Sequence, residues 1–228
     1  YPGRLEGSKE VQVRARVEGI LLRRTYTEGQ QVEAGQLLFE IDSAPFEVAL
    51  NRAKAQLAQA RASLSAAERR WRRASELIKT NAISQRDRDD AESELEEARA
   101  TLQLAEAEVS AAQINLDYCK VRAPISGITR REQVSEGSLV GPSANSLLTS
   151  ITQLDPLWVN ISMPDEMVLL LRRLLKEGEL SYDESQRAVQ IETAGEQTHP
   201  HLGHVNFSDS VIDRNTGTVQ FRATVDNP

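Results

Sequence analysis

Two stretches of the chain that lie far apart carry the same short motif. Residues 14–32 read RARVEGILLRRTYTEGQQV, and residues 122–140 read RAPISGITRREQVSEGSLV. Identical residues recur 108 positions later, with Ala15, Gly19, Ile20, Arg23, Glu28, Gly29 and Val32 matching Ala123, Gly127, Ile128, Arg131, Glu136, Gly137 and Val140. Because two copies are too few for a solenoid, we interpret them as the halves of one small β domain, 9–42 and 119–153. A further segment is inserted between the two halves.

The inserted segment, residues 43–118, is predicted to form a helical hairpin. From residue 47 onward it contains neither Gly nor Pro, and it is rich in strong helix formers such as Ala, Leu, Glu, Arg and Gln. Large apolar residues repeat every seven positions in each arm: Leu50, Leu57, Leu64, Trp71 and Ile78, then Leu95, Leu102, Val109 and Leu116. This spacing is typical of coiled-coil seams. We expect Asp42 or Ser43 to cap the first helix and the tip to lie near residues 80–85.

The residue numbers of the two arms support an antiparallel pairing. In such a pairing the numbers of two facing residues always add up to about the same sum. The sum is 166 for four pairs of large residues: Leu50–Leu116, Leu57–Val109, Leu64–Leu102 and Trp71–Leu95. Half of this sum falls within residues 81–84, Asn-Ala-Ile-Ser, which we predict to be the turn. A basic stretch at 69–73 is expected to face an acidic stretch at 92–97. Such exposed pairs set the register more than the stability, since each contributes about 0–1 kcal/mol.

Composition and charge exclude several classes of function. The net charge of −7 argues against nonspecific nucleic-acid binding, which needs clustered positive charge. The single cysteine, Cys119, excludes an internal disulfide, and no run of roughly 18 apolar residues is present to span a membrane. No Ser-His-Asp or Cys-His arrangement and no phosphate-binding loop stands out, so we expect neither an enzyme nor a cofactor. The chain starts at Tyr1 without Met, and we expect it to be a piece of a longer protein.

The split motif resembles that of a known protein family. RARVEGIL, YTEGQQVEAGQLLFEID, CKVRAPISGIT and VSEGSLV, divided by a long α-hairpin, are similar to the lipoyl-like domain of periplasmic adaptors. These adaptors, also called membrane fusion proteins, serve tripartite efflux pumps. The later stretches ITQLDPLWVNISMPDE and FSDSVIDRNTGTVQFRATVDNP resemble parts of the β-barrel domain of that family. In adaptors of RND-type pumps this barrel carries one short helix, which we expect at about 164–176.

The resemblance implies an elongated α+β protein of several domains. A β-barrel domain is expected from residues 1–8 and 154–228, and a lipoyl-like domain from 9–42 and 119–153. The antiparallel coiled-coil hairpin, 43–118, is inserted in the latter. The membrane-proximal domain of the family is expected to lie largely outside this chain.

The resemblance also implies a function without catalysis. The expected role is that of an adaptor in the Gram-negative periplasm that bridges an inner-membrane RND drug/proton antiporter and an outer-membrane channel of the TolC type. Self-association in a ring of about six copies and attachment to the inner membrane by an anchor outside this chain are implied as well. The alternative within the family is an adaptor of an ABC- or MFS-type exporter. A lipoyl or biotin carrier is the alternative of another class, but the hairpin replaces the turn that would bear the modified lysine.

Within the family, the hairpin tip carries an Arg-x3-Leu-x6-Ser signature that engages the channel, and Arg73, Leu77 and Ser84 match it in register. Each residue also has a purely structural interpretation. Arg73 could pair with Glu92, Leu77 could help to close the seam, and Ser84 could form a capping box with Asp87. The resemblance favours channel binding, although Ser84 could do both.

The three histidines of the chain are the candidates for a metal site. His199, His201 and His204 lie close together in the sequence, and imidazole is a common metal ligand. However, no carboxylate or thiol joins them nearby, and the intervening Pro and Gly are typical of a turn. We therefore predict no metal site.

Overall fold

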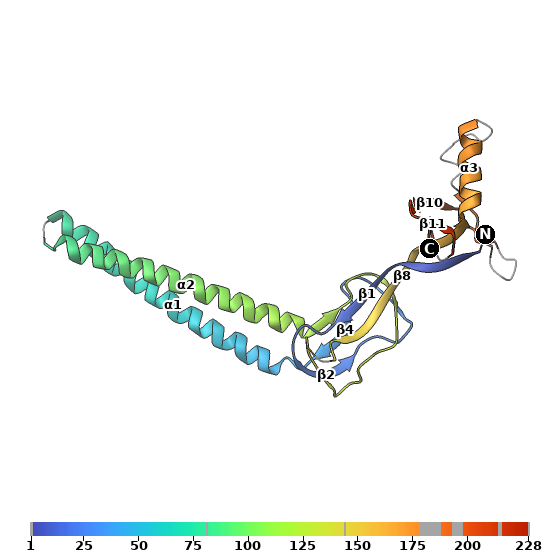
Figure 1. Ribbon diagram of the computed structural model, residues 1–228. Coiled ribbons are helices and arrows are strands. Elements are labelled where there is room, and N and C mark those ends of the chain that lie inside the picture. The colour runs from blue at the N-terminus through green and yellow to red at the C-terminus, as the bar shows by residue number, and fades with distance from the viewer. Residues whose placement is uncertain are drawn as a thin grey trace.

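The structure, a computed structural model, describes residues 2–80, 82–143, 145–177, 188–192, 198–213 and 216–227. The described molecule is elongated. A rod of two helices projects from one β region, and a second β region with a third helix lies at the opposite end (Figure 1).

The rod consists of α1 (Ala44–Leu77) and α2 (Gln85–Tyr118), with a short 3-10 turn, η1 (Ile78–Thr80), after α1. The two helices lie side by side and run in opposite directions (Figure 1). The most buried residues of the rod include Leu50 and Leu95 of the predicted seam. The others are alanines that recur between the large seam residues, namely Ala53, Ala60, Ala67 and Ala105. Asn81 of the predicted turn lies outside the described residues. The rest of the predicted turn, at residues 82–84, connects the two helices as expected.

Both predicted capping residues lie at the start of α1. Ser43 occupies the N-cap position, but its hydroxyl donates to Glu47 (2.8 Å) rather than capping the backbone. The capping bond comes from Asp42, whose carboxylate accepts from the N–H of Ala44 (3.0 Å).

Ion pairs cross the rod at fewer places than predicted. Arg70 pairs with Glu94 as expected, and Arg61 pairs with Glu106 (3.9 Å). Two other members of these stretches, Arg69 and Glu92, bond within their own helix. Arg69, for example, donates to Ser65 (2.6 Å).

The strands form two sheets whose members are far apart in the sequence. The strands are β1 (Gly3–Arg14), β2 (Gly19–Arg24), β3 (Gln31–Val32), β4 (Leu37–Ile41), β5 (Lys120–Arg122), β6 (Gly127–Thr129), β7 (Leu139–Val140), β8 (Leu147–Pro164), β9 (Ala188–Val189), β10 (Gly203–Ser208) and β11 (Thr218–Val225). One sheet has the order β5-β4-β2-β7. The other has the order β3-β6-β8-β11-β10-β9, and β1 pairs with β8 as well.

The two copies of the repeated motif pair with each other reciprocally. In the β2–β7 pair, Gly19 lies opposite Val140, and in the β3–β6 pair, Gly127 lies opposite Val32. Gly127 and Val140 are the 108-residue counterparts of Gly19 and Val32. Each copy therefore supplies the strand partner that the other copy needs.

The repeated Glu-Gly pairs lie at turns, as the sequence predicts. Gly29 has a φ of 77° and Gly137 a φ of 83°, which is the left-handed region that glycine adopts without strain. The two turns lead into the short strands β3 and β7.

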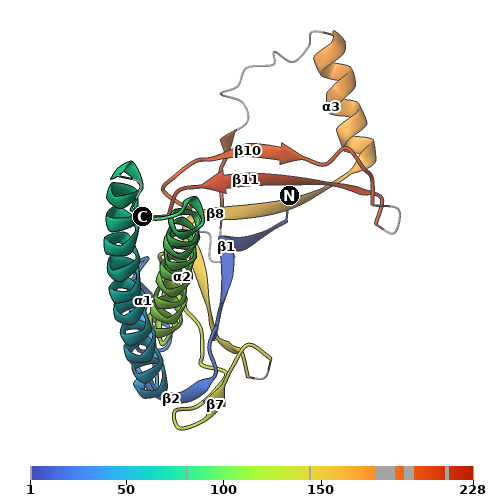
Figure 2. The same cartoon turned by 90° about the vertical axis from the view of Figure 1, so that its left-hand side faces the viewer.

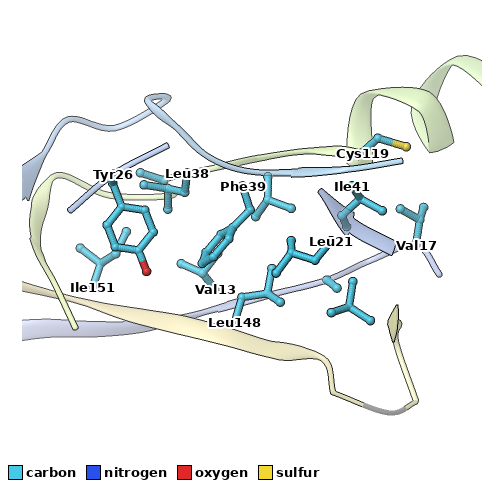
Figure 3. Close-up of a cluster of buried hydrophobic side chains, with 14 of the residues drawn as sticks. Val13, Val17, Leu21, Tyr26, Leu38, Phe39, Ile41, Cys119, Leu148 and Ile151 are labelled. Atoms are coloured by element: carbon cyan, nitrogen blue, oxygen red, sulfur yellow. The ribbon is translucent and has the colours of Figure 1, made fainter. Parts of the chain in front are cut away.

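One hydrophobic core joins the two halves of the motif (Figure 3). The first half supplies Leu21, Leu38, Phe39 and Ile41, and the second supplies Leu148 and Ile151, all at most 2% exposed. The ring of Tyr26 packs edge-to-face on Phe39, with 5.3 Å between the ring centroids. Removing either half would expose the apolar face of the other, so the core requires both.

The second β region is continuous with the first. β1 and β8 are long paired strands that extend through both regions (Figure 1), with a register shift between Gly7 and Lys9. A Cβ atom at Gly7 would lie 2.3 Å from Cγ2 of Thr152, so the close approach of the strands requires glycine there. The predicted domain boundaries, 8/9 and 153/154, fall inside these strands rather than in linkers.

A short helix follows β8, as predicted. This helix, α3 (Asp165–Glu177), begins directly where β8 ends and projects away from the sheet near the ends of β10 and β11 (Figure 2). A small second core lies on the adjoining sheet and contains Val159, Ala223 and Val225. No helix within the described ranges is both long and apolar enough to span a lipid bilayer.

Candidate partner-binding site at the hairpin tip

Hydrogen bonds on both sides of the turn hold the hairpin tip. Ser84 is the N-cap of α2, and its hydroxyl oxygen accepts from the N–H of Asp87 (3.2 Å). The Asp87 carboxylate accepts in return from the N–H (3.1 Å) and the hydroxyl (2.6 Å) of Ser84. On the α1 side, the carbonyl of Leu77 accepts from the N–H of Ala82 (3.0 Å) and from Thr80 (2.9 Å). The predicted capping box is therefore present, and it satisfies backbone groups that a helix end leaves open.

The capping box has an electrostatic consequence for Asp87. The hydrogen bonds from the side chain and backbone of Ser84 lower the pKa of the Asp87 carboxyl below its ordinary value. This shift arises because both bonds favour the charged form of the carboxyl group. The Ser84 hydroxyl donates its only proton to this carboxylate and retains a single lone pair as a further acceptor.

Leu77 contributes little to the seam of the rod. Its side chain is 45% exposed, whereas the next residue, Ile78, is half-buried. Of the two residues, the predicted seam residue Ile78 is the more buried, so the structure gives no particular support to closure of the seam by Leu77.

Arg73 lies one helical turn before Leu77, so both residues lie on the same strip of α1. Its predicted alternative partner, Glu92, is bound instead by Arg88 of its own helix (3.1 Å). No ion pair involves Arg73 within the described part of the chain. The structure thus brings Arg73 and Leu77 together on an exposed strip and places Ser84 at the start of the facing helix.

Arg88 is a tip residue that the sequence argument missed. Its guanidinium lies over the ring of Trp71, 5.2 Å from the centroid, and its side chain is 31% exposed. The heptad of α2, counted back seven residues from Leu95, reaches Arg88. This seven-residue spacing could have identified Arg88 as a seam position. The sequence argument counted only apolar residues, however, and therefore passed over a charged one.

The side chains of the tip are of kinds that can bind another protein. An arginine without an ion pair can bind a carboxylate or carbonyl oxygens through two parallel hydrogen bonds. An exposed leucine one turn away can fill an apolar hollow between helices. The small Ser84 allows close approach of a partner where α2 begins.

The histidines are not gathered into a metal site. The rings of His199 and His201 lie 5.8 Å apart, and Nδ1 of His199 contacts the carbonyl oxygen of His201 (3.2 Å). His204 belongs to β10, where its backbone pairs opposite Thr224. Over the residues that the structure describes, no three side chains of ligand type are positioned to hold a metal ion.

Comparison with known proteins gives matches over nearly the whole chain. Residues 9–152 match the family model "RND MFP, barrel-sandwich hybrid domain", and residues 156–228 match "RND MFPs, beta-barrel domain". The efflux pump periplasmic linker BepD of Brucella suis biovar 1 (strain 1330) is 44% identical over 230 residues, which cover 100% of this chain and 58% of BepD. The multidrug export protein AcrE of Escherichia coli (strain K12) is 36% identical over 227 residues, covering 100% of this chain and 59% of AcrE. The chain thus spans a little under three fifths of the length of these relatives.

A solved structure shows the same fold. The crystal structure of MacA from Actinobacillus actinomycetemcomitans superposes with a TM-score of 0.74 at 24% identity, covering 99% of this chain and 72% of MacA. The family models cover the paired half-motifs, the inserted rod and the second β region. The chain therefore belongs to the RND membrane fusion protein (MFP) family.

Proposed function

We propose that the chain is the rod-bearing part of a noncatalytic periplasmic adaptor. The adaptor bridges an inner-membrane RND drug/proton antiporter and an outer-membrane channel of the TolC type. The observation that carries this proposal is the exposed strip of α1 at the tip, where Arg73 makes no ion pair with any residue that the structure describes and Leu77 is 45% exposed. The names of the relatives, a periplasmic linker of an efflux pump and a multidrug export protein, support the export of drugs or other toxic compounds.

The dimensions of the rod fit a bridging role. Each helix has 34 residues, which at 1.5 Å per residue gives a length of about 50 Å. Two helices alone bury only a thin seam, so a rod of this length is better suited to contact a partner at its end than to form a core. The tip carries the channel-binding residues Arg73, Leu77 and Ser84.

The two β regions have a different task in this proposal. The lipoyl-like domain, 9–42 with 119–153, and the β-barrel domain, 1–8 with 154–228, pack against neighbouring copies and against the transporter. A ring of about six copies, attached to the inner membrane, encloses the path of the exported compound. Closed rings of this kind bury lateral faces that a thin module cannot bury alone.

The lipoyl-like domain acts as a scaffold and not as a carrier of a cofactor. The carrier class needs a lysine on a tight turn between the two halves. Here α1 and α2 emerge at that point, and Lys120 lies on β5 instead. Because the family model names an RND partner, an ABC- or MFS-type exporter is the less favoured partner.

Substitutions at the tip test the proposal. We expect Arg73→Asp or Leu77→Ala in the intact protein to abolish drug efflux and co-purification of the channel. The fold should persist, since neither side chain belongs to the buried seam. Val48→Ala provides a matched control, because Val48 is 70% exposed at the other end of α1.

The outcome is read from efflux and from complex formation together. Loss of both in the tip variants, with an unchanged circular dichroism spectrum and a normal Val48→Ala variant, supports channel binding by the tip. Efflux at the wild-type level in both tip variants would show that the assignment of Arg73 and Leu77 is wrong.

A further inference from the structure

A second surface, distant from the tip, has the features of a binding groove. It lies at the base of the rod between β1 and β5 and has a volume of about 550 Å³. Its walls are formed by residues 11–14 and 16, by Tyr118 at the end of α2, and by residues 120–124. This volume is within the range of about 300–1,000 Å³ that is usual for ligand pockets. We call this surface the basal groove.

The basal groove is strongly basic in a chain that is acidic as a whole. Four cationic side chains line it, and no carboxylate does: Arg14, Arg16, Lys120 and Arg122. The net charge of the chain is −7, so this cluster is a local reversal of sign. None of the four makes an ion pair within the described ranges. The carboxylate of Glu40 interacts with Lys120 electrostatically, but it is bound by two nitrogens of Arg23 at 2.7 and 3.1 Å.

Three of these cations are held in place by uncharged groups. The guanidinium of Arg14 donates to Gln12 (2.7 Å) and to Ser146 (2.7 Å). Arg122 donates to the carbonyl of Gly35 (2.8 Å), and Arg16 lies 5.0 Å from the ring centroid of Tyr118. Side chains that are already ordered lose less entropy when they bind a ligand, and their positive charge remains unneutralised.

The two borders of the basal groove are edge strands. β5 is the outer strand of its sheet and pairs with β4 alone, while β1 pairs with β8 alone, among the described strands. An edge strand presents unpaired backbone N–H and C=O groups and is a template for a further strand. Along β5 the side chains alternate as the pleat requires, with Val121 buried and both Lys120 and Arg122 exposed.

We propose that the basal groove binds an extended acidic peptide segment of another protein. The segment adds as a strand to the edge of β5, and its carboxylates contact Arg14, Arg16, Lys120 and Arg122. Its alternate, apolar side chains lie on the ring of Tyr118 and on Val11. A free phosphate would use the cations alone, whereas an extended peptide uses the cations and the backbone edge of β5. This site does not depend on the role proposed for the tip.

A blocked synthetic peptide that alternates glutamate and valine is the probe, and the full 228-residue chain is the target. Binding is measured by fluorescence anisotropy of the labelled peptide, at low and high salt. We expect the double variant Arg16→Glu with Lys120→Glu to weaken binding by about tenfold or more, since like charges then face each other. The matched control is Lys54→Glu with Arg131→Glu, which changes the net charge equally on exposed residues outside the groove. This control is expected to bind as the wild type does.

A second peptide separates strand addition from simple charge attraction. It has the same sequence but carries N-methyl groups on alternate amides, which removes backbone hydrogen bonding and keeps the charge. We expect it to bind at least about tenfold more weakly, and we expect the unmodified peptide to slow hydrogen exchange at Lys120 and Arg122. Equal binding of both peptides, or unchanged exchange in β5, would overturn the proposal. Equal losses in the groove variant and its control would overturn it as well.

Discussion

The backbone N–H of Arg24 donates a 2.8 Å hydrogen bond to the carboxylate of Glu136. A bond of the same length runs from the N–H of Glu132 to the carboxylate of Glu28. The two bonds are related by the 108-residue shift of the repeat, so each Glu-Gly turn is bound to the other half of the domain. The repeated glycine permits the turn, and the repeated glutamate joins the halves.

Removal of one of these glutamates should destabilise the domain without changing its fold. We expect Glu136→Ala to lower the free energy of unfolding by about 1 kcal/mol, because the backbone N–H of Arg24 loses a charge-assisted acceptor. Urea titration followed by circular dichroism measures the change. The control is Glu33→Ala, an exposed glutamate of the same domain. If Glu136→Ala and Glu33→Ala unfold at the same urea concentration, the cross-half bonds contribute nothing.

Cys119 should be unreactive in the folded protein. Its thiol is 1% exposed at the junction of α2 and β5, and burial raises its pKa, with further contributions from Asp42 and Glu47. Because the thiolate is the reactive form, we expect a thiol reagent to label Cys119 only in denaturant. Rapid labelling in native buffer would show that the base of the rod is open.

The start of α2 should fray in acid. The pKa of Asp87 is lowered in the folded state, so its capping contribution is fully present above the ordinary value of 3.8. The contribution is lost as the pH falls below that value and through the lower folded pKa. The amide of Ser84, which donates to the Asp87 carboxylate, should therefore be less protected from hydrogen exchange at acidic pH than at neutral pH. In Asp87→Asn the Ser84 amide should be less protected at neutral pH, and its protection should no longer depend on pH in this way. If the protection of this amide varies with pH identically in the wild type and in Asp87→Asn, the capping role of Asp87 is refuted.

The contact between Arg88 and Trp71 should stabilise the end of the rod. We expect Arg88→Ala to cost about 1 kcal/mol, through the lost cation–π contact and the lost pair with Glu92. It should also shift the emission of Trp71, which is recorded in a Trp158→Phe background. Arg86→Ala is the control, because the Arg86 side chain is 90% exposed. An unchanged Trp71 spectrum in Arg88→Ala would contradict the contact.

The sequence predicted the rod and the paired halves because both rest on strict periodicity. Large residues at seven-residue spacing must lie on one face of a helix, and a motif with matched glycines must form matched turns. The sequence argument missed that the seam of α2 extends to Arg88, because the heptad position there holds a charged residue instead of an apolar one. The continuity of β1 and β8 was also missed. The expected boundaries between the two β domains came from the resemblance to a family. A single long strand such as β1 or β8 can cross such a boundary, and its sequence does not change in character there.

The candidate residues of the tip could be named from the sequence, but their surroundings only in part. The heptad spacing did place Ile78 rather than Leu77 in the seam, and the structure agrees, since Ile78 is half-buried and Leu77 is 45% exposed. The partner of Glu92 depends on which of two arginines reaches it, and the intrahelical Arg88 does. The basal groove joins Arg14 and Arg16 to Lys120 and Arg122, which only the closed fold brings together.

Photo-crosslinking in cells tests the role of the tip most directly. A photoreactive amino acid replaces Leu77 at the exposed tip, or Val48 at the base of the rod, in the intact adaptor. We predict that the probe at position 77 crosslinks to the outer-membrane channel, and that the probe at position 48 does not. A probe at position 77 that captures only the inner-membrane transporter, or a channel crosslink from position 48 alone, would contradict the account.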